Sequence, residues 1–178
     1  MSPDSIDPSV LDAPVAGRNL APGPLRLQLG SRPTLLVFLR HLGCLFASEW
    51  LAEIQAAVKS DPTFPALLYF HLGTVKQGDD FFEPSAPEAR AVADPKQYYY
   101  KAFGVPTASP LQLLDPRVWA CGIRATRNGY KQQGKPVGNP FVKPGLFLVQ
   151  AEQVTWSFIP DQLGGLPRLT EIPRPLTV

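Results

Sequence analysis

The sequence predicts one α/β domain in which helices cover both faces of a mixed central sheet. Three observations predict it. Four short apolar runs have the length and composition of buried strands. Helical segments with amphipathic spacing or clear start signals lie between the runs. Only a short polar link separates the last two runs, 145–149 and 154–159, so they predict a closing β-hairpin.

The first predicted strand is the run 34–39, which ends at Arg40. It has six apolar or β-forming residues without polar alternation, which is typical of a strand buried on both faces. The second run, 66–70, is entered through Pro65. These two strands, together with the terminal hairpin, form the predicted sheet.

The segment 48–60 is expected to form the first long helix. Its apolar residues recur at spacings of three and four: Trp50, Leu51, Ile54 and Val58. A short helix after the hairpin is predicted to close the domain.

Two Asp-Pro pairs predict two further helices. Asp94 and Pro95 place a capping carboxylate before a proline at the first helical position, and Gly104 is the expected stop. The pair at 115–116 repeats the pattern, with Gly129 as its stop.

Residues 1–24 are predicted to form a proline-rich N-terminal arm that lies on the domain or leads into it. This segment holds five prolines and three aspartates, and residues 10–11 are its only adjacent aliphatic pair. The domain itself is expected to span 25–178.

Composition narrows the function classes. The chain has 178 residues, of which 44% are hydrophobic and 18% charged, and its net charge is +2. We therefore expect a globular protein with neither nucleic acid nor a membrane as partner. Two cysteines and two histidines are too few for a disulfide framework or a structural metal site. The N-terminal residues lack the pattern of a secretory signal, so a cytoplasmic protein with reduced thiols is expected.

The segment 35–54 carries the most informative chemistry. A buried strand ends at Arg40, Gly43 permits a sharp turn, and Cys44 comes at the start of the next helix. Free backbone N–H groups at a helix start stabilise an anion, and Arg40 and His41 are expected to add positive charge. A thiolate there is a nucleophile toward peroxides or disulfides. A thiol that merely packs well is the alternative.

The order Phe38-x-Arg40-x-x-Gly43-Cys44 resembles the peroxiredoxin-like branch of the AhpC/TSA proteins, which includes the prostaglandin F synthase-like and selenoprotein U groups. Asp94-Pro95 followed by the residues 99–104 is similar to a second segment of that family. The resemblance covers roughly 25–172. It implies a thioredoxin-like three-layer sandwich and an oxidoreductase with antioxidant activity.

Two departures from the family pattern shape the expected mechanism. Ala47 stands where the second cysteine of the motif belongs, which excludes a local dithiol relay. His41 stands where the peroxiredoxin loop has Thr or Ser. The resemblance then implies a one-cysteine mechanism: Cys44 reduces a hydroperoxide or disulfide, and an external thiol such as glutathione or a thioredoxin-like protein regenerates it. It requires no metal or organic cofactor.

Two other functions stay open. A catalytically silent binding or scaffold protein of the same fold is the main alternative. Reduction of a lipid endoperoxide is the third, and Ala47 disfavours it because the relatives with that activity use the dithiol.

Two residues are candidates to assist Cys44. The resemblance gives Pro144 the place of a proline that shapes the substrate groove and is often cis, whereas an ordinary trans proline is the alternative. Cys121 falls on an apolar stripe of the helix after Pro116, which favours core packing over a role as resolving thiol.

Charge is unevenly distributed along the chain. Six cations and no acid lie between 116 and 151. A solvated surface is the main interpretation, and attraction of an anionic substrate or a partner protein is the alternative. Aromatic runs at 81–82 and 98–100 are expected to pack in the core, and any exposed part favours a homo-oligomer.

Overall fold

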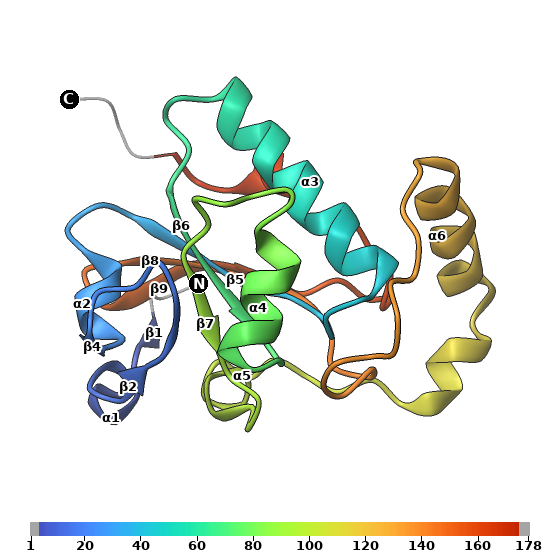
Figure 1. The fold of residues 1–178 in the computed structure, drawn as a ribbon. Helices are drawn as coiled ribbons and strands as arrows, with labels where there is room; N and C mark the ends of the chain where they lie inside the picture. The colour runs from blue at the N-terminus through green and yellow to red at the C-terminus, as the bar shows by residue number, and fades with distance from the viewer. Residues whose placement is uncertain (1–3, 175–178) are drawn as a thin grey trace.

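A mixed seven-stranded sheet forms the centre of the protein (Figure 1). The computed structural model describes residues 4–174. In spatial order the strands are β1 (Asp4–Ser5), β9 (Gln153–Phe158), β8 (Gly145–Gln150), β5 (Thr34–Phe38), β6 (Ala66–His71), β7 (Ala91–Ala93) and β3 (Gly17–Arg18). The central strand β5 pairs parallel with β6 and antiparallel with β8, so the predicted mixed sheet and closing hairpin are confirmed.

Helices cover both faces of this sheet, as the sequence predicts. The helices are α1 (Pro8–Leu11), α2 (Arg26–Leu29), α3 (Leu45–Ser60), α4 (Val75–Phe82), α5 (Tyr98–Ala102) and α6 (Pro116–Arg127). Two 3-10 helices, η1 (Pro110–Leu114) and η2 (Leu169–Glu171), complete the set. The expected short helix after the hairpin is the 3-10 helix η2. Two short strands, β2 (Pro14–Val15) and β4 (Gly23–Pro24), form a separate ribbon.

Alternate residues of β5 point into two separate hydrophobic cores. Leu35 and Val37 pack in the core that α3 and α4 cover, whereas Leu36 and Phe38 pack in the core on the α1 and α5 side. All five residues of β5 are buried, which explains the absence of polar alternation in this run. The three-layer sandwich is thereby confirmed.

Of the three helix starts that the sequence predicts, the structure confirms the one at Pro116 and differs at the other two. Helix α6 begins at Pro116, and the Asp115 carboxylate accepts from the backbone N–H of Arg117. Helix α3 begins at Leu45, three residues before the start that the amphipathic pattern predicts, but directly after Cys44 as the turn at Gly43 predicts.

The start predicted for α5 at Pro95 is wrong. That helix begins at Tyr98, because the Asp94 carboxylate reaches further along the chain and accepts from the backbone N–H groups of residues 98, 99 and 100. The predicted end of this helix near Gly104 is confirmed, since Gly104 has a φ of +66° just beyond the last helical residue.

Residues 4–24 contribute to the sheet and to its core. β1 pairs with β9 at one edge, and β3 pairs with β7 at the other. Ile6, Val10 and Leu11 are buried in the core on the α5 side. Of residues 4–174, no helix is long and apolar enough to cross a membrane.

Candidate functional site

The carboxyl ends of β5 and β6 lie at the same edge of the sheet, because these strands are parallel. The chain leaves β5 through Leu39, Arg40 and His41 and turns at Gly43 into α3. Gly43 has a φ of +85°, and a Cβ there would collide with the carbonyl oxygen of Gln133. The backbone N–H of Gln133 donates to the carbonyl of Gly43 at 2.8 Å. Only glycine fits this turn, which places Cys44 at the helix start.

Cys44 is the N-cap residue of α3, as the sequence predicts. Its side chain belongs to a small buried cluster with Phe46, Ala47 and Ala125, and the residue is only 2% exposed. Its own carbonyl accepts the N–H of Ala47 at 3.0 Å and that of Ser48 at 3.2 Å. The sulfur therefore lies beside the positive end of a 16-residue helix, with little contact with solvent.

Arg40 lies against this sulfur. Its Nη1 donates to Cys44 Sγ at 3.2 Å, and its Nη2 donates to the carbonyl of Pro140 at 2.6 Å. The guanidinium carbon lies 5.4 Å from the centre of the Phe46 ring. Burial lowers the pKa of Arg40 and the neighbouring Cys44 opposes that shift, yet a guanidinium stays charged at neutral pH. A fixed cation therefore faces the thiol.

His41 does not add the positive charge that the sequence predicts. The residue is 5% exposed, and its Nδ1 lies 3.2 Å from the carbonyl of Leu42, to which it donates as the neutral tautomer. Burial lowers the pKa of His41, although this hydrogen bond partly opposes the shift, and the charge of Arg40 lowers it further. The imidazole is therefore neutral at pH 7, so of these two residues it is Arg40 that provides positive charge beside Cys44.

Pro144 lies at the same edge of the sheet as Arg40. It is buried and directly precedes β8, whose first residue, Gly145, pairs with Phe38 at the end of β5. The peptide bond before Pro144 is trans, which is the alternative that the sequence left open.

The wall behind Cys44 is helix α6. Cys121 is half-buried on α6 and packs against the cluster that contains Cys44, and both cysteines are free thiols. Val118 and Ala125 of the same helix are buried, which fits the predicted apolar stripe. Gly164 lies so close to Cys121 and the Phe46 ring that a Cβ there would overlap both.

An ion pair that the sequence analysis missed holds α6 against α3. The Glu49 carboxylate is fully buried, and it accepts from Arg124 at 2.8 and 3.1 Å. Its signal in the sequence is an acid directly before Trp50, in a segment whose other residues are mostly apolar. The pairing itself joins residues 75 positions apart, so no local pattern reveals it.

His71 has the surroundings of a structural histidine. It ends β6, is fully buried, and its Nδ1 accepts the N–H of Gly73 at 3.3 Å. Its Nε2 has no hydrogen-bond partner within residues 4–174 and lies against Gly78 of α4. No group of three potential metal ligands occurs in the same described range.

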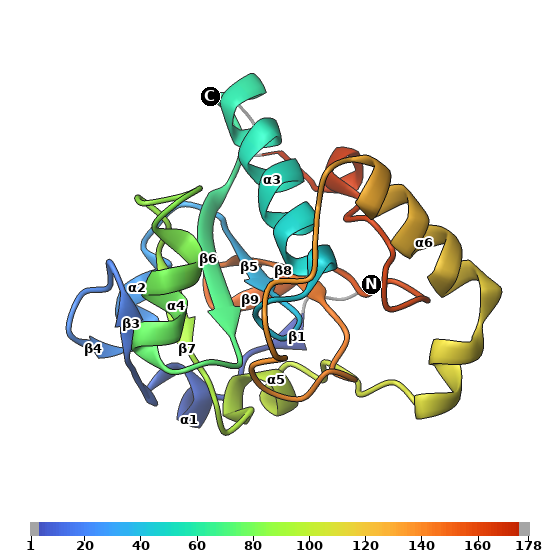
Figure 2. The ribbon, with the colours of Figure 1, turned by 45° about the vertical axis from the view of Figure 1, so that its right-hand side comes forward.

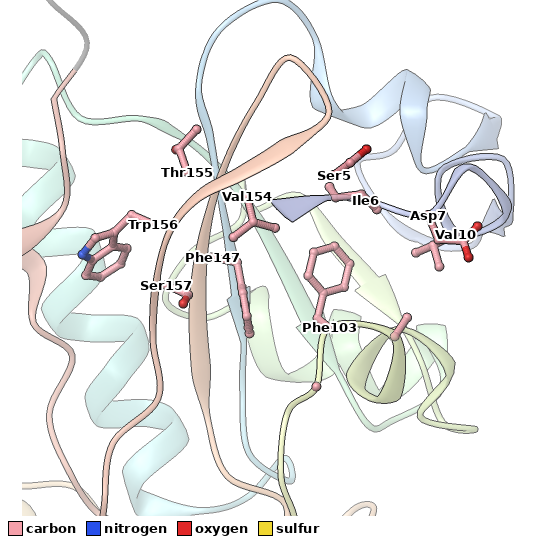
Figure 3. A pocket seen from close by; sticks show the side chains of 12 residues that line it. Ser5, Ile6, Asp7, Val10, Phe103, Phe147, Val154, Thr155, Trp156 and Ser157 are labelled. Atoms are coloured by element: carbon pink, nitrogen blue, oxygen red, sulfur yellow. The ribbon is translucent and has the colours of Figure 1, made fainter. Parts of the chain in front are cut away.

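A cavity of about 680 Å³ lies on another part of the sheet (Figure 3). Phe103, Phe147 and Val154 surround it on one side, with Ile6 and Val10 of the N-terminal segment across from them. It includes neither Cys44 nor Arg40. This cavity therefore does not contain the candidate nucleophile, and Cys44 itself is enclosed.

Comparison with known proteins places the chain in a family. The sequence model described as "AhpC/TSA antioxidant enzyme" matches residues 52–162, more than half of the chain. The matched stretch begins after Cys44. No curated protein sequence matches the chain.

Solved structures show the same fold. Peroxiredoxin Q from Xanthomonas campestris is 17% identical over 91% of this chain and 89% of its own, with a TM-score of 0.59. Prx3 from Vibrio vulnificus, in complex with hydrogen peroxide, is 11% identical over 90% of this chain and 84% of its own, with a TM-score of 0.60. Peroxidoxin BcpB from Mycobacterium tuberculosis is 16% identical over 91% and 87%, with a TM-score of 0.57.

At these identities the likeness establishes a thioredoxin-like peroxiredoxin fold. The match to the antioxidant family supports a peroxidase or thiol-oxidoreductase activity. The chain belongs to the AhpC/TSA antioxidant enzyme family.

Proposed function

We propose that this protein is a thiol peroxidase that uses Cys44 as its single reactive cysteine. The observation that carries the proposal is the 3.2 Å contact between Arg40 Nη1 and Cys44 Sγ at the N-terminus of α3. Burial alone disfavours a thiolate, since it removes water from the charge. A fixed guanidinium and the free amides of the helix start supply the missing stabilisation.

The proposed reaction consumes one hydroperoxide. The Cys44 thiolate attacks the terminal oxygen, a sulfur–oxygen bond forms and the oxygen–oxygen bond breaks. The departing alkoxide takes up a proton and leaves as an alcohol, or as water when the substrate is hydrogen peroxide. Cys44 is thereby oxidised to a sulfenic acid.

The burial of Cys44 favours small hydroperoxides over bulky ones and over protein disulfides. With 2% of the residue exposed, a water-sized oxidant reaches the sulfur more easily than a protein surface does. A disulfide substrate would have to displace part of the cluster that encloses Cys44. We therefore propose a hydroperoxide as the substrate class.

An external thiol completes the proposed cycle. Ala47 provides no sulfur next to Cys44, so a thiol such as glutathione or a thioredoxin-like protein attacks the sulfenic acid and releases water. A second thiol then frees Cys44 from the mixed disulfide and leaves the reductant oxidised. Pro144, at the same sheet edge, is proposed to shape the approach. Two free cysteines are consistent with the cytoplasm as the proposed compartment.

A second candidate function is a binding or scaffold protein without catalysis. The observation that favours it is the enclosure of Cys44 among Phe46, Ala47 and Ala125, because a thiol in apolar surroundings is usually inert.

Trapping of the sulfenic acid separates the two functions. The reduced protein is treated with hydrogen peroxide and dimedone and is then analysed by peptide mass spectrometry. The proposal expects a dimedone adduct on Cys44, its loss in Cys44→Ser, and its persistence in the matched control Cys121→Ser. Turnover of peroxide with glutathione or a thioredoxin system is expected to follow the same pattern. An unlabelled Cys44 in a protein that consumes no peroxide would support the binding protein instead.

A further inference from the structure

A groove of about 450 Å³ lies between α3, the end of α4 and the loop that follows α6. Helix α3 contributes Ser48 and Gln55, the loop contributes Tyr130 and Gln133, and α4 contributes Phe81. Hydroxyl and amide groups thus accompany two aromatic rings in its lining. Such a lining suits a small polar molecule that presents several hydrogen-bonding groups.

The groove adjoins the Cys44 site. Phe81 and Tyr130 line the groove and also pack against the buried cluster that contains Cys44. Ser48 follows Cys44 by four residues, so both lie on one side of the helix start, and the Ser48 N–H donates to the Cys44 carbonyl at 3.2 Å. Cys44 itself does not line the groove, so a layer of side chains separates the two.

The loop after α6 is bound to the turn that carries Cys44. The Gln133 N–H donates to the carbonyl of Gly43 at 2.8 Å, and the Val137 N–H donates to the carbonyl of Leu42 at 3.2 Å. Figure 2 shows this segment, in orange, running beside α3 toward the start of that helix. Its residues are therefore held next to the candidate nucleophile.

Two free cations lie on this loop. Lys131 and Lys135 flank Gln133 by two residues on either side, within about 7 Å of it along the chain. Both are exposed, and neither forms an ion pair within the described part of the chain. They belong to the stretch in which the sequence has six cations and no acid.

The acids around the groove are few, and most are already paired. Asp80 forms an ion pair within α4 at 3.1 Å, and Glu49 forms the buried pair with α6. Burial raises the pKa of Tyr130, and the charges of Glu53 and Glu49 raise it further, so Glu53 also faces this loop. Glu53 has no ion pair among residues 4–174. The loop therefore offers two cations and one carboxylate to a ligand.

We propose that this groove binds an anionic peptide thiol of the glutathione type, which reduces oxidised Cys44. This inference rests on the proposed function. The thiol of glutathione lies between two carboxylates, and Lys131 and Lys135 lie on either side of the residue that bonds to the Gly43 turn. Its ammonium group matches Glu53. A small peptide also reaches a sulfur in a residue that is 2% exposed more easily than a protein reductant does.

The proposed step balances with two peptide thiols. The first thiol sulfur attacks the sulfur of the Cys44 sulfenic acid; a sulfur–sulfur bond forms, the sulfur–oxygen bond breaks, and the hydroxyl leaves as water with the proton of the thiol. The second thiol attacks the peptide sulfur of the mixed disulfide. Cys44 returns to the thiol, and the peptide leaves as its disulfide.

Binding of S-methylglutathione, which has both carboxylates but no free thiol, tests the site without depending on catalysis. Isothermal titration of the reduced full-length protein is expected to show saturable binding. The double variant Lys131→Gln with Lys135→Gln is expected to weaken it by about threefold or more. The matched control is Lys96→Gln with Lys101→Gln, which removes the same charge at two exposed lysines in and before α5.

Stopped-flow reduction of the Cys44 sulfenic acid tests the role of the site in the cycle. The Lys131→Gln and Lys135→Gln double variant is expected to slow reduction by glutathione about threefold more than reduction by uncharged 2-mercaptoethanol.

Absence of saturable binding would overturn the proposal, as would an equal loss of affinity in the two double variants. Equal slowing with both thiols would also overturn it, because charge would then not select the peptide. Saturable binding that depends on Lys131 and Lys135, in a protein whose Cys44 forms no sulfenic acid, would overturn the proposed peroxidase function and still support the binding site.

Discussion

As the pH falls below neutral, protonation of His71 in the unfolded chain is expected to lower the free energy of unfolding before the carboxylates are protonated. The imidazole is fully buried at the end of β6, with its ring 6.0 Å from that of Phe82 and its Nε2 against Gly78. Burial lowers the pKa of His71 from 6.5 to about 4, and the charge of Asp79 opposes the shift only partly. The folded state therefore holds His71 neutral at pH values where the unfolded chain protonates it.

The sign and size of the effect follow from this difference. Between pH 6.5 and pH 4 the unfolded state binds more protons than the folded state, so stability falls as the pH falls. A shift from 6.5 to about 4 corresponds to about 3 kcal/mol at about 1.4 kcal/mol per pKa unit. That is a large part of the 5–15 kcal/mol by which a typical domain is stable. His41, whose pKa burial also lowers, contributes in the same direction.

Urea unfolding at several pH values between 7 and 4, monitored by tryptophan emission, measures this loss of stability. The variant His71→Asn keeps a side-chain oxygen near the Gly73 N–H but has no titrating group. The free energy of unfolding of the wild type is expected to fall by about 3 kcal/mol more than that of the variant across this range. His41→Asn serves as the control for the second histidine. Parallel pH curves for the wild type and His71→Asn would refute the reasoning.

Three further predictions concern the Cys44 site and the ion pair that holds α6 against α3. Ala47→Cys is expected to form a reversible disulfide with Cys44, because residue 47 lies in the first turn of α3 and its N–H bonds to the Cys44 carbonyl. Thiol counts with and without dithiothreitol measure it: Cys121 is expected to be the one free thiol after mild oxidation, and three free thiols would contradict the placement. Arg40→Met is expected to slow peroxide oxidation of Cys44 by about tenfold or more, since the variant removes the cation at 3.2 Å from the sulfur. The control Arg40→Lys is expected to retain part of the rate. An unchanged rate in Arg40→Met would show that the helix start alone suffices. Glu49→Gln is expected to lower the free energy of unfolding by about 1–3 kcal/mol, because Arg124, which is about one-third exposed, loses its buried charged partner. Denaturant unfolding measures the loss. A variant as stable as the wild type would contradict the prediction.

The parts of the fold that the sequence predicts well depend on local patterns. The apolar runs at β5, β6 and β8 are long enough to identify buried strands. The hairpin of β8 and β9 follows from its short link. By contrast, α4 was missed, because its capping box at Thr74 and Gln77 is followed by polar residues with few apolar positions.

The same distinction applies to the site. The proximity of Arg40 to Cys44 was predictable, since both flank one strand–turn–helix junction. The enclosure of Cys44 was not, because Ala125 of α6 lies 81 positions further along the chain and closes the cluster through tertiary packing. Likewise, the neutral state of His41 results from burial that no sequence pattern reports.

The account rests on the claim that the cation of Arg40 keeps a buried Cys44 thiol reactive. Stopped-flow measurement of Cys44 oxidation by hydrogen peroxide at pH 7, in the Cys121→Ser background, tests it most directly. The account predicts a rate constant at least about tenfold above that of free cysteine. A rate constant at or below that of free cysteine would contradict it, since burial would then dominate over the guanidinium.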